Sequence, residues 1–161
     1  MDKVIIERLN ISELTKFFNL YKSIATTDFK LWDPASKEKW FTDDYSIDYW
    51  KQGIIENKLP ILVARIGEKL VGYVMLEVIN FGVGYLGWIG ILKDYQNKQI
   101  GSSLLGAIEE WCRGNGIHKI ELETQEKELK HFYEMNGFVL EGVKKNSWQH
   151  LDNYMFGKEL S

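Results

Sequence analysis

The sequence predicts an α/β protein with a central mixed, mostly antiparallel sheet that carries helices on both faces. First, the strand candidates at residues 69–79 and 85–92 are almost entirely apolar, as strands are in the middle of a sheet covered on both faces. Second, short turns join the early strands and helices join the late ones, which requires antiparallel and parallel pairs in one sheet. The chain has 161 residues, 45% of them hydrophobic, so we expect one domain over residues 1–161.

The first elements are a strand over residues 4–9 and a helix that Asn10 caps, with Glu13 as the capping-box partner. Apolar side chains at helical spacing form the buried stripe of that helix: Leu14, Phe17, Phe18, Tyr21 and Ile24. Residues 27–45 show no period, so no regular element is predicted there. Ser46 then caps a second helix, which a later proline ends.

The middle of the chain predicts a hairpin of two strands over residues 61–66 and 69–79. A further turn at residues 80–84 returns the chain as the strand at 85–92, and an amphipathic helix follows. The apolar side of that helix consists of Leu104, Leu105, Ile108, Trp111 and Cys112. The helix ends at Gly114 or Gly116, because glycine is the preferred residue beyond a helix end. The remaining elements are a strand over 120–123, a helix over 129–135 and strands over 138–143 and 153–160.

The turn between the strand at 85–92 and the following helix is the most informative stretch of the chain. It reads Gln96-Asn97-Lys98-Gln99-Ile100-Gly101-Ser102-Ser103. A buried strand, a short polar turn and a helix, in this order, direct the first free backbone N–H groups of the helix above the end of the strand. These N–H groups and the positive end of the helix dipole favour a phosphate. We therefore expect a phosphorylated cofactor at this turn.

This stretch also resembles the acyl-CoA pyrophosphate loop of the GNAT N-acetyltransferases, which reads Gln/Arg-x-x-Gly-x-Gly/Ala and opens the longest helix. Gln96 and Gly101 match the loop, whereas Gln99 stands where the inner glycine is expected. Two further stretches resemble the same family: residues 132–138 its tyrosine helix with the following Gly-Phe, and residues 152–160 its last strand. Three signatures in the right order make the resemblance specific.

For the cofactor, the resemblance implies acetyl-CoA as the cosubstrate. The residues implied to hold its pyrophosphate are Gln96, Asn97, Lys98, Gln99, Ile100, Gly101, Ser102 and Ser103. The main chain of Ile91, Leu92 and Lys93 would pair with the pantetheine arm like an added strand. Glu126 aligns with an asparagine that usually contacts this arm, which is a second departure from the family pattern.

Gln99 raises a conformational question, because glycine allows backbone angles and close approaches that a Cβ can block. Gln99 can instead adopt a negative φ and keep its N–H directed at the phosphate. CoA is anionic, so local positive charge has to come from Lys93, Lys98 and the N–H groups of the loop.

For the chemistry, the resemblance implies Tyr133 as the catalytic residue. Attack of an amine on a thioester forms a tetrahedral oxyanion and then expels a thiolate, to which a nearby phenol can donate a proton. Tyr133 also belongs to a helical stripe with Leu129 and Phe132, a pattern that packing alone explains as well.

The base and the acceptor site are less well defined. An alkylammonium has a pKa of about 10.4 and must lose a proton before it attacks. Residues 85–92 contain no Asp, Glu or His, so Glu77, Tyr85 and a water chain stay open as the base. In residues 28–50, where the resemblance implies the acceptor site, aromatic residues alternate with aspartates: Trp32, Asp33, Trp40, Asp43, Asp44 and Tyr45. They predict either a cage for a cationic amine or aromatic anchors that hold a long loop on the core.

We therefore expect an N-acetyltransferase that moves the acetyl group of acetyl-CoA to a primary amine, preferably of a small molecule, by direct attack in a ternary complex. An acyl-enzyme is disfavoured because the only cysteine, Cys112, lies on the wrong helix. The alternatives are a peptide or protein N-terminus or a lysine as the acceptor, and a CoA-binding regulatory module without turnover. The missing base, Gln99 and Glu126 would favour the module.

The composition argues against several other classes. A net charge of −3 argues against nucleic-acid binding, and one cysteine with three unclustered histidines argues against a metal site. The apolar runs are strand-sized and no leader segment is apparent, so we expect a cytoplasmic protein without membrane contact. Gly82-x-Gly84-x-x-Gly87 matches a dinucleotide fingerprint, but it leads into a strand and not into a helix. The family resemblance leaves a homodimer open.

Overall fold

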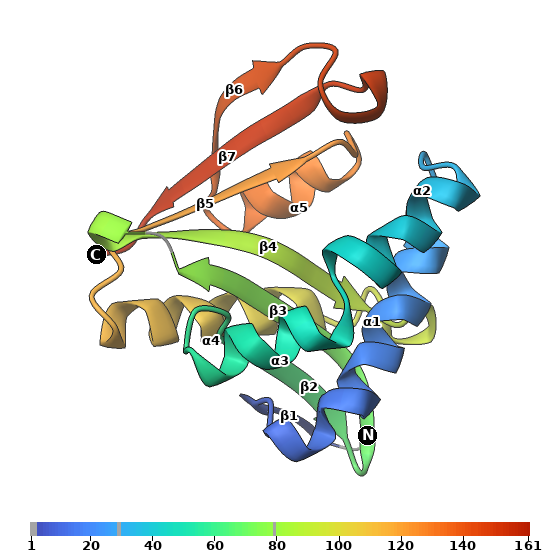
Figure 1. The fold of residues 1–161 in the computed structure, drawn as a ribbon. Helices are drawn as coiled ribbons and strands as arrows, with labels where there is room; N and C mark the ends of the chain where they lie inside the picture. The colour runs from blue at the N-terminus through green and yellow to red at the C-terminus, as the bar shows by residue number, and fades with distance from the viewer. Residues whose placement is uncertain (1–2, 29, 79) are drawn as a thin grey trace.

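The computed structural model describes residues 3–28, 30–78 and 80–161 of the chain. Seven strands form one sheet in the order β1-β2-β3-β4-β5-β7-β6. The β4–β5 pair is parallel and the other neighbouring pairs are antiparallel, so the predicted mixed sheet is confirmed (Figure 1). The strands are β1 (Val4–Arg8), β2 (Ile61–Ile66), β3 (Lys69–Val78), β4 (Val83–Ile91), β5 (Lys119–Thr124), β6 (Val139–Lys144) and β7 (Asn153–Glu159).

Helices cover both faces of this sheet, as predicted. Helices α4 and α5 contribute to the buried cluster on one face, and α1 and α3 contribute to the cluster on the other (Figure 1). The helices are α1 (Leu14–Asp28), α2 (Pro34–Lys39), α3 (Ile47–Ile55), α4 (Ile100–Gly114) and α5 (Leu129–Met135). The short helical turns are η1 (Ile11–Glu13), η2 (Trp40–Asp44), η3 (Asn80–Gly82), η4 (Lys93–Tyr95) and η5 (Trp148–His150).

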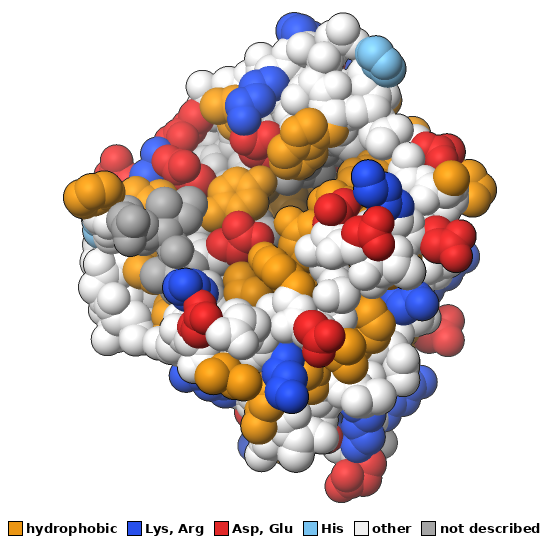
Figure 2. Space-filling view, viewed as in Figure 1, with side chains coloured by type: hydrophobic (Ala, Val, Ile, Leu, Met, Phe, Trp, Pro, Cys, Tyr) orange, Lys and Arg blue, Asp and Glu red, His pale blue; other side chains and the backbone are white. Residues whose placement is uncertain are grey.

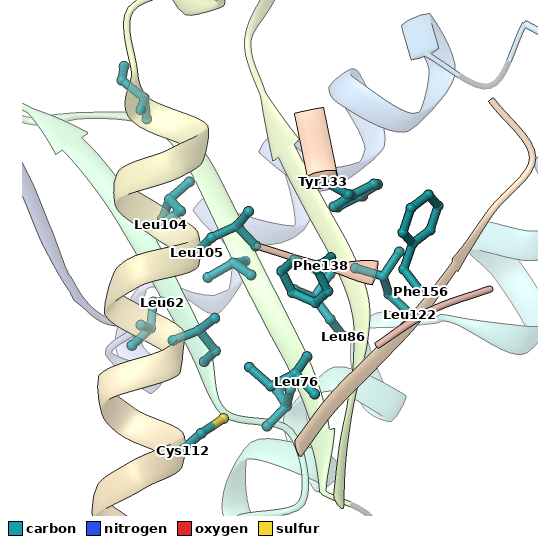
Figure 3. Close-up of a cluster of buried hydrophobic side chains, with 14 of the residues drawn as sticks. Leu62, Leu76, Leu86, Leu104, Leu105, Cys112, Leu122, Tyr133, Phe138 and Phe156 are labelled. Atoms are coloured by element: carbon teal, nitrogen blue, oxygen red, sulfur yellow. The ribbon is translucent and has the colours of Figure 1, made fainter. Parts of the chain in front are cut away.

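The long helix α4 is held against the sheet by its apolar side. Leu104 and Leu105 extend from it into a cluster with strand side chains such as Leu76 (Figure 3). Each buried leucine contributes about 1.5–3 kcal/mol of burial free energy. Cys112 lies in the same cluster, and burial, together with the charge of Glu109, raises the pKa of its thiol to about 12. The thiol therefore stays protonated and packs as a small hydrophobic group, as expected.

The predicted helix caps are found, with one difference. Asn10 Oδ1 accepts a hydrogen bond from the Ser12 N–H at 2.9 Å, and Ser46 caps α3. The prediction that Glu13 completes a capping box is wrong. Its carboxylate instead accepts a hydrogen bond from the Arg65 guanidinium on β2 at 2.7 Å, because an ion pair with a neighbouring strand competes with the local contact.

The absence of regular structure predicted for residues 27–45 is wrong. Helix α1 runs to Asp28, and α2 begins at Pro34. Asp33 caps α2, since its Oδ1 accepts the Ser36 N–H at 3.0 Å. Aspartate at the cap followed by proline is a helix-start signal that the sequence contains. The missing apolar period concealed the helix, because α2 is six residues long and buries none of its side chains.

The hairpin between β3 and β4 confirms the rejection of a dinucleotide motif. Gly82 lies in the turn and Gly84 and Gly87 lie in β4, so no helix begins within this glycine pattern. Strand β3 ends at Val78, and Ile79, the predicted last residue of that strand, lies outside the described residues.

Candidate active site

A cavity opens where the two parallel strands separate. Strands β4 and β5 pair over three positions that end at Tyr85 and Glu121; beyond them β4 continues along β3 and β5 along β7. A cavity of about 1100 Å³ is bounded by β4, the start of α4, the segment after β5 and helix α5. The space-filling view shows a hollow on this face with hydrophobic and acidic side chains around it (Figure 2). The strand separation therefore creates the site.

The main chain of β4 presents hydrogen-bonding groups to this cavity. The Leu92 N–H donates to the Val71 carbonyl on β3 at 2.9 Å. Because backbone groups alternate in direction along an antiparallel strand, those of Ile89 and Ile91 point away from β3 and toward the gap. The Ile91 carbonyl accepts a hydrogen bond from Gln96 Nε2 at 3.1 Å. Of the three positions expected to pair with a pantetheine arm, Ile91 lines the cavity, whereas Leu92 and Lys93 lie outside its lining.

The start of α4 forms the second wall of the cavity. The Ser103 N–H donates to the Gln99 carbonyl at 3.0 Å, which is the first bond of the helix. The N–H groups of Ile100, Gly101 and Ser102 precede it and are not used by the helix. These three residues line the cavity together with Gln96, Asn97 and Gln99. The start of α4 therefore offers three free N–H donors at the positive end of the helix dipole.

The negative φ considered for Gln99 is wrong. Gln99 has φ 61° and Asn97 has φ 59°, so both lie in the left-handed region. The chain is extended at Gln96 and helical at Ile100, and it makes this sharp change of direction through Gln99. A left-handed conformation costs a residue with a Cβ about 1–2 kcal/mol, which is why glycine is favoured at such a position.

Gly101 is required by close packing and not by its backbone angles. A Cβ at this position would lie 3.1 Å from Ile91 Cδ1 and 3.1 Å from Phe132 Cζ. Helix α4 therefore approaches β4 and α5 as closely as a glycine allows. Lys98 lies on the outer side of the loop, where its Nζ donates to the Asp94 carbonyl at 2.9 Å, and it does not line the cavity.

Tyr133 combines a packing role with a position on the cavity wall. Its ring packs against Phe132, Phe138 and Phe156, and it lines the cavity from α5. Burial, followed by the charges of Glu126 and Tyr85, raises the pKa of the phenol. Tyr133 therefore stays protonated and can act as a hydrogen-bond or proton donor. The two interpretations of the sequence, packing and chemistry, are compatible.

A model of the acetyltransferase (GNAT) family matches residues 19–138 of the chain. The chain belongs to the GNAT acetyltransferase family.

Individual relatives agree with this assignment. Streptothricin acetyltransferase A of Bacillus subtilis is 27% identical over 103 residues, which span 63% of this chain and 57% of that protein. The crystal structure of PaiA N-acetyltransferase from Thermoplasma acidophilum, in complex with coenzyme A, has a TM-score of 0.79 at 21% identity over 98% of this chain and 99% of that chain. A spermidine N-acetyltransferase chimera from Vibrio cholerae and hSSAT has a TM-score of 0.75 at 20% identity over 98% of this chain and 95% of that chain. At these identities the structures establish a shared fold.

In this GNAT protein, the open face of the sheet brings acidic and polar side chains into the cavity. Glu77 on β3 stands opposite Tyr85 on β4, and both line the cavity. Burial raises the pKa of Glu77, an effect that a 3.5 Å hydrogen bond from the Tyr49 hydroxyl partly offsets. Burial also raises the pKa of Tyr85, so its phenol is neutral. Of these two groups, Glu77 is the one that can accept a proton near neutral pH.

Aromatic side chains from the segment after α1 form the opposite wall. Trp40 stacks on Tyr45 with ring centroids 4.3 Å apart, and Trp32 meets Trp40 edge-on at 4.9 Å. Trp40 Nε1 donates to the Tyr21 hydroxyl at 2.8 Å, which fixes the indole. Trp32, Trp40 and Tyr45 line the cavity, while the buried Phe41 anchors the same segment in the core. The aromatic residues therefore anchor the segment on the core, and three of them also form part of the cavity wall, while the cation cage stays a prediction.

The aspartates that were expected beside these aromatic rings do not line the cavity. Asp33 caps α2, and Asp43 and Asp44 are exposed outside the cavity lining. The acidic residues that line the cavity come from other elements: Asp28, Glu77, Glu123, Glu126 and Glu128. The sequence gives no sign of the role of Glu123, because a single glutamate on a strand matches no motif; in the structure its side chain is only 14% exposed.

Three residues beyond the predicted set join the walls of the cavity. Gln125 Oε1 accepts the Trp32 Nε1–H at 3.2 Å, and Gln125 Nε2 donates to the Trp148 carbonyl at 2.7 Å. Asn153 at the start of β7 lines the cavity beside Trp148. The contact between Trp32 and Gln125 joins segments that are 93 residues apart in the sequence, so no local pattern could predict it.

Among residues 3–28, 30–78 and 80–161, no group of three or more His, Cys, Asp or Glu side chains could hold a metal ion. None of the helices in the same residues is long and apolar enough to cross a membrane.

Proposed function

We propose that this GNAT protein is an N-acetyltransferase that transfers the acetyl group of acetyl-CoA to a primary amine of a small molecule, by direct attack in a ternary complex. The observation that carries the proposal is one cavity lined by the first residues of α4, by Tyr133 and by Glu77. A phosphate site, a proton donor and a proton acceptor are the groups that acyl transfer from a thioester to an ammonium requires.

The residues of the cavity suit acetyl-CoA at two places. The N–H groups of Ile100, Gly101 and Ser102 suit the pyrophosphate, and the outward main chain of Ile89 and Ile91 suits the amides of a pantetheine arm. Acetyl-CoA, when bound, supplies a thioester that an amine can attack. The Gln96 side chain donates to the Ile91 carbonyl, so it would have to give up this hydrogen bond before the pantetheine arm could bond the same oxygen. Glu126 lines the same cavity and would lie beside the arm.

Two side chains would move the protons. Glu77 is the base in this proposal, because burial raises its pKa toward the range in which a general base is most effective. Tyr133 would donate to the departing thiolate, since its phenol is neutral and lines the cavity. Cys112 is buried in the core and outside the cavity lining, which favours direct attack over an acyl-enzyme.

Similar proteins include acetyltransferases of small molecules as well as of a ribosomal-protein alanine, and it is the small-molecule names that support this proposal. Streptothricin and spermidine, after which two of them are named, are small molecules. The experiment is a thiol-release assay with acetyl-CoA and a panel of small amines, N-terminal peptides and a lysine peptide. Release with small amines and not with peptides supports the proposal, and the reverse contradicts it. Calorimetry with acetyl-CoA completes the test, because binding without release for any amine would indicate a CoA-binding module.

A further inference from the structure

We infer that the acceptor carries a second cationic amine, remote from the reacting one, and that this second ammonium binds at Asn153 and Glu123. The acceptor would then belong to the class of diamines and longer polyamines. This inference rests on the proposed function for its reaction, but the binding site that it describes can be tested separately.

Sheet register places the relevant side chains on one face. Glu77 stands directly opposite Tyr85, and Glu123 stands directly opposite Met155, two residues from Asn153 on β7. Side chains two residues apart on a strand point to the same face. The buried neighbours of these residues, such as Leu76 and Leu86, lie on the other face with α4. Glu77 and Asn153 therefore lie on the same face of the sheet, with the gap between β4 and β5 separating them.

Asn153 has an unused hydrogen-bond acceptor. The side chain is fully buried, and its Nδ2 donates to Glu123 Oε2 at 3.0 Å. The carboxylate can only accept, so this bond fixes the amide orientation and directs Oδ1 elsewhere. Within the described residues, Asn153 Oδ1 has no hydrogen-bond partner. An unpaired buried acceptor is costly, and a ligand N–H that reached Oδ1 would remove that cost.

The charge of the cavity selects the sign of the ligand. Of the charged residues that line it in the described part of the chain, five are carboxylates and one is a lysine, Lys30. Lys144 partly neutralises Glu123 through a 2.5 Å contact with Oε1. Glu77 has no comparable cationic neighbour among the causes of its pKa shift, and its carboxylate is held by Tyr49. A cavity with this balance attracts cations and repels an acceptor that carries a carboxylate.

The walls of the cavity suit an aliphatic cation. Trp32, Trp40, Tyr45 and Trp88 line it with aromatic rings, which bind methylene groups by burial and ammonium groups through their π faces. Burial raises the pKa of Tyr85 most, and the charges of Glu123 and Glu77 raise it further, so Tyr85 lies close enough to feel both carboxylates. A chain with an ammonium at each end would pass Tyr85 with one end toward Glu77 and the other toward Asn153.

The experiment compares three acceptors of equal chain length: cadaverine, pentylamine and aminovalerate. Their binding to the CoA-saturated protein is measured by calorimetry, and their acetylation is measured by thiol release. Cadaverine should exceed pentylamine about tenfold or more in affinity and in kcat/KM, as one charged hydrogen bond predicts, and aminovalerate should be the weakest. Equal values for cadaverine and pentylamine would overturn the inference. Preferential cadaverine binding without thiol release would retain it and overturn the proposed function.

Two variants locate the second ammonium. Asn153→Leu removes Oδ1 with little change in volume, and Glu123→Gln removes the charge but keeps groups that can bond Asn153 and Lys144. Either change should bring the cadaverine-to-pentylamine ratio of affinities close to one. Asp43→Asn is the matched control, since it removes an exposed carboxylate outside the cavity and should retain the ratio. A ratio unchanged in Glu123→Gln would contradict this location, even if Asn153→Leu failed to fold.

Discussion

The two halves of the cavity are built in different ways. On the side of α4, the groups offered to a ligand are main-chain N–H and C=O groups, fixed by a left-handed Gln99, a close-packed Gly101 and an unpaired strand edge. On the opposite side, they are side chains that come from α1, β3, β5 and β7. Main-chain groups are present in every residue, so the first half tolerates changes of side chain except at Gly101, where close packing requires a glycine. The second half depends on the identity of each residue.

This difference gives the two halves separate roles. A site made of amides at a helix start can bind a common cosubstrate in many different sequences, because it requires one backbone path and little else. A site made of side chains can change its acceptor through a few substitutions without any change of fold. Substitutions in the two halves should therefore have different effects on acetyl-CoA and on the amine.

The largest effect is expected for Tyr133→Phe, which removes one oxygen from the wall between the halves. If the phenol donates to the leaving thiolate, kcat should fall about 100-fold with little change in the KM for acetyl-CoA. The ring packing with Phe138 and Phe156 is kept, so the melting temperature should change little. Tyr154→Phe, a buried tyrosine outside the cavity lining, is the control and should retain kcat. A kcat within threefold (about the scatter of single-contact effects) would exclude Tyr133 from the chemistry.

A second large effect is expected for Glu77→Gln, on the acceptor side only. Loss of a general base lowers kcat/KM for the amine about 100-fold, and the KM for acetyl-CoA should not change. Protonated Glu77 cannot act as a base, so wild-type kcat/KM should fall as the pH drops through the raised pKa of Glu77. The variant should lack this acid limb. A limb that persists unchanged in the variant would assign it to another group.

A smaller effect is expected for substitutions of two glycines on the same helix. Gly101→Val adds side-chain carbons where a Cβ already lies 3.1 Å from Ile91 and Phe132, so the start of α4 must shift. The affinity for acetyl-CoA should fall about tenfold or more, as for the loss of one good phosphate contact. Gly106→Ala has open space around its Cβ and should leave the affinity unchanged while stabilising the protein by about 0.5–1 kcal/mol. Equal affinities in both variants would contradict the packing argument.

Gln99→Gly should have a modest effect of the opposite sign. Its φ of 61° is one that glycine adopts without strain, so the substitution removes about 1 kcal/mol of strain from the folded state. Part of this gain is lost, because glycine also raises the conformational entropy of the unfolded chain. The melting temperature should rise or stay the same, and acetyl-CoA affinity should stay the same or improve. Calorimetry and thermal unfolding check both, and a large loss of affinity would mean that the pyrophosphate does not bind at this turn.

The smallest expected effect is the pH dependence of stability at Glu77. Its folded-state pKa is raised above 4.5 by burial, so the folded state disfavours the charged form and stability falls as the pH rises through the folded pKa. Glu77→Gln should therefore be more stable than the wild type at neutral pH, by about 1 kcal/mol or less because the group is only half buried. The gain should vanish below pH 4.5, where the carboxyl is neutral in both states. Denaturant unfolding at two pH values measures it.

Local sequence determined the half of the site that depends on local geometry. The strand, the polar turn and the amphipathic helix are consecutive, so their order alone predicted a phosphate-binding helix start at Gln96–Ser103, while Tyr133 was implied by the family resemblance. The left-handed φ of Gln99 was not predicted, although the family has a glycine at this position, because the residue present carries a Cβ that disfavours this conformation. The sequence also predicted the mixed sheet, since burial on both faces is visible as apolar runs.

The acceptor half was decided by the tertiary structure. Glu123, Gln125 and Asn153 meet Trp32 and Glu77 only because β4 and β5 separate after Tyr85 and leave one face of the sheet open. The aspartates beside Trp32 and Trp40 were the natural candidates for a cation cage, yet they point to solvent or cap a helix. Periodicity reports which side chains an element buries, but not which distant element supplies their neighbours. Only the packed chain brings these charges together.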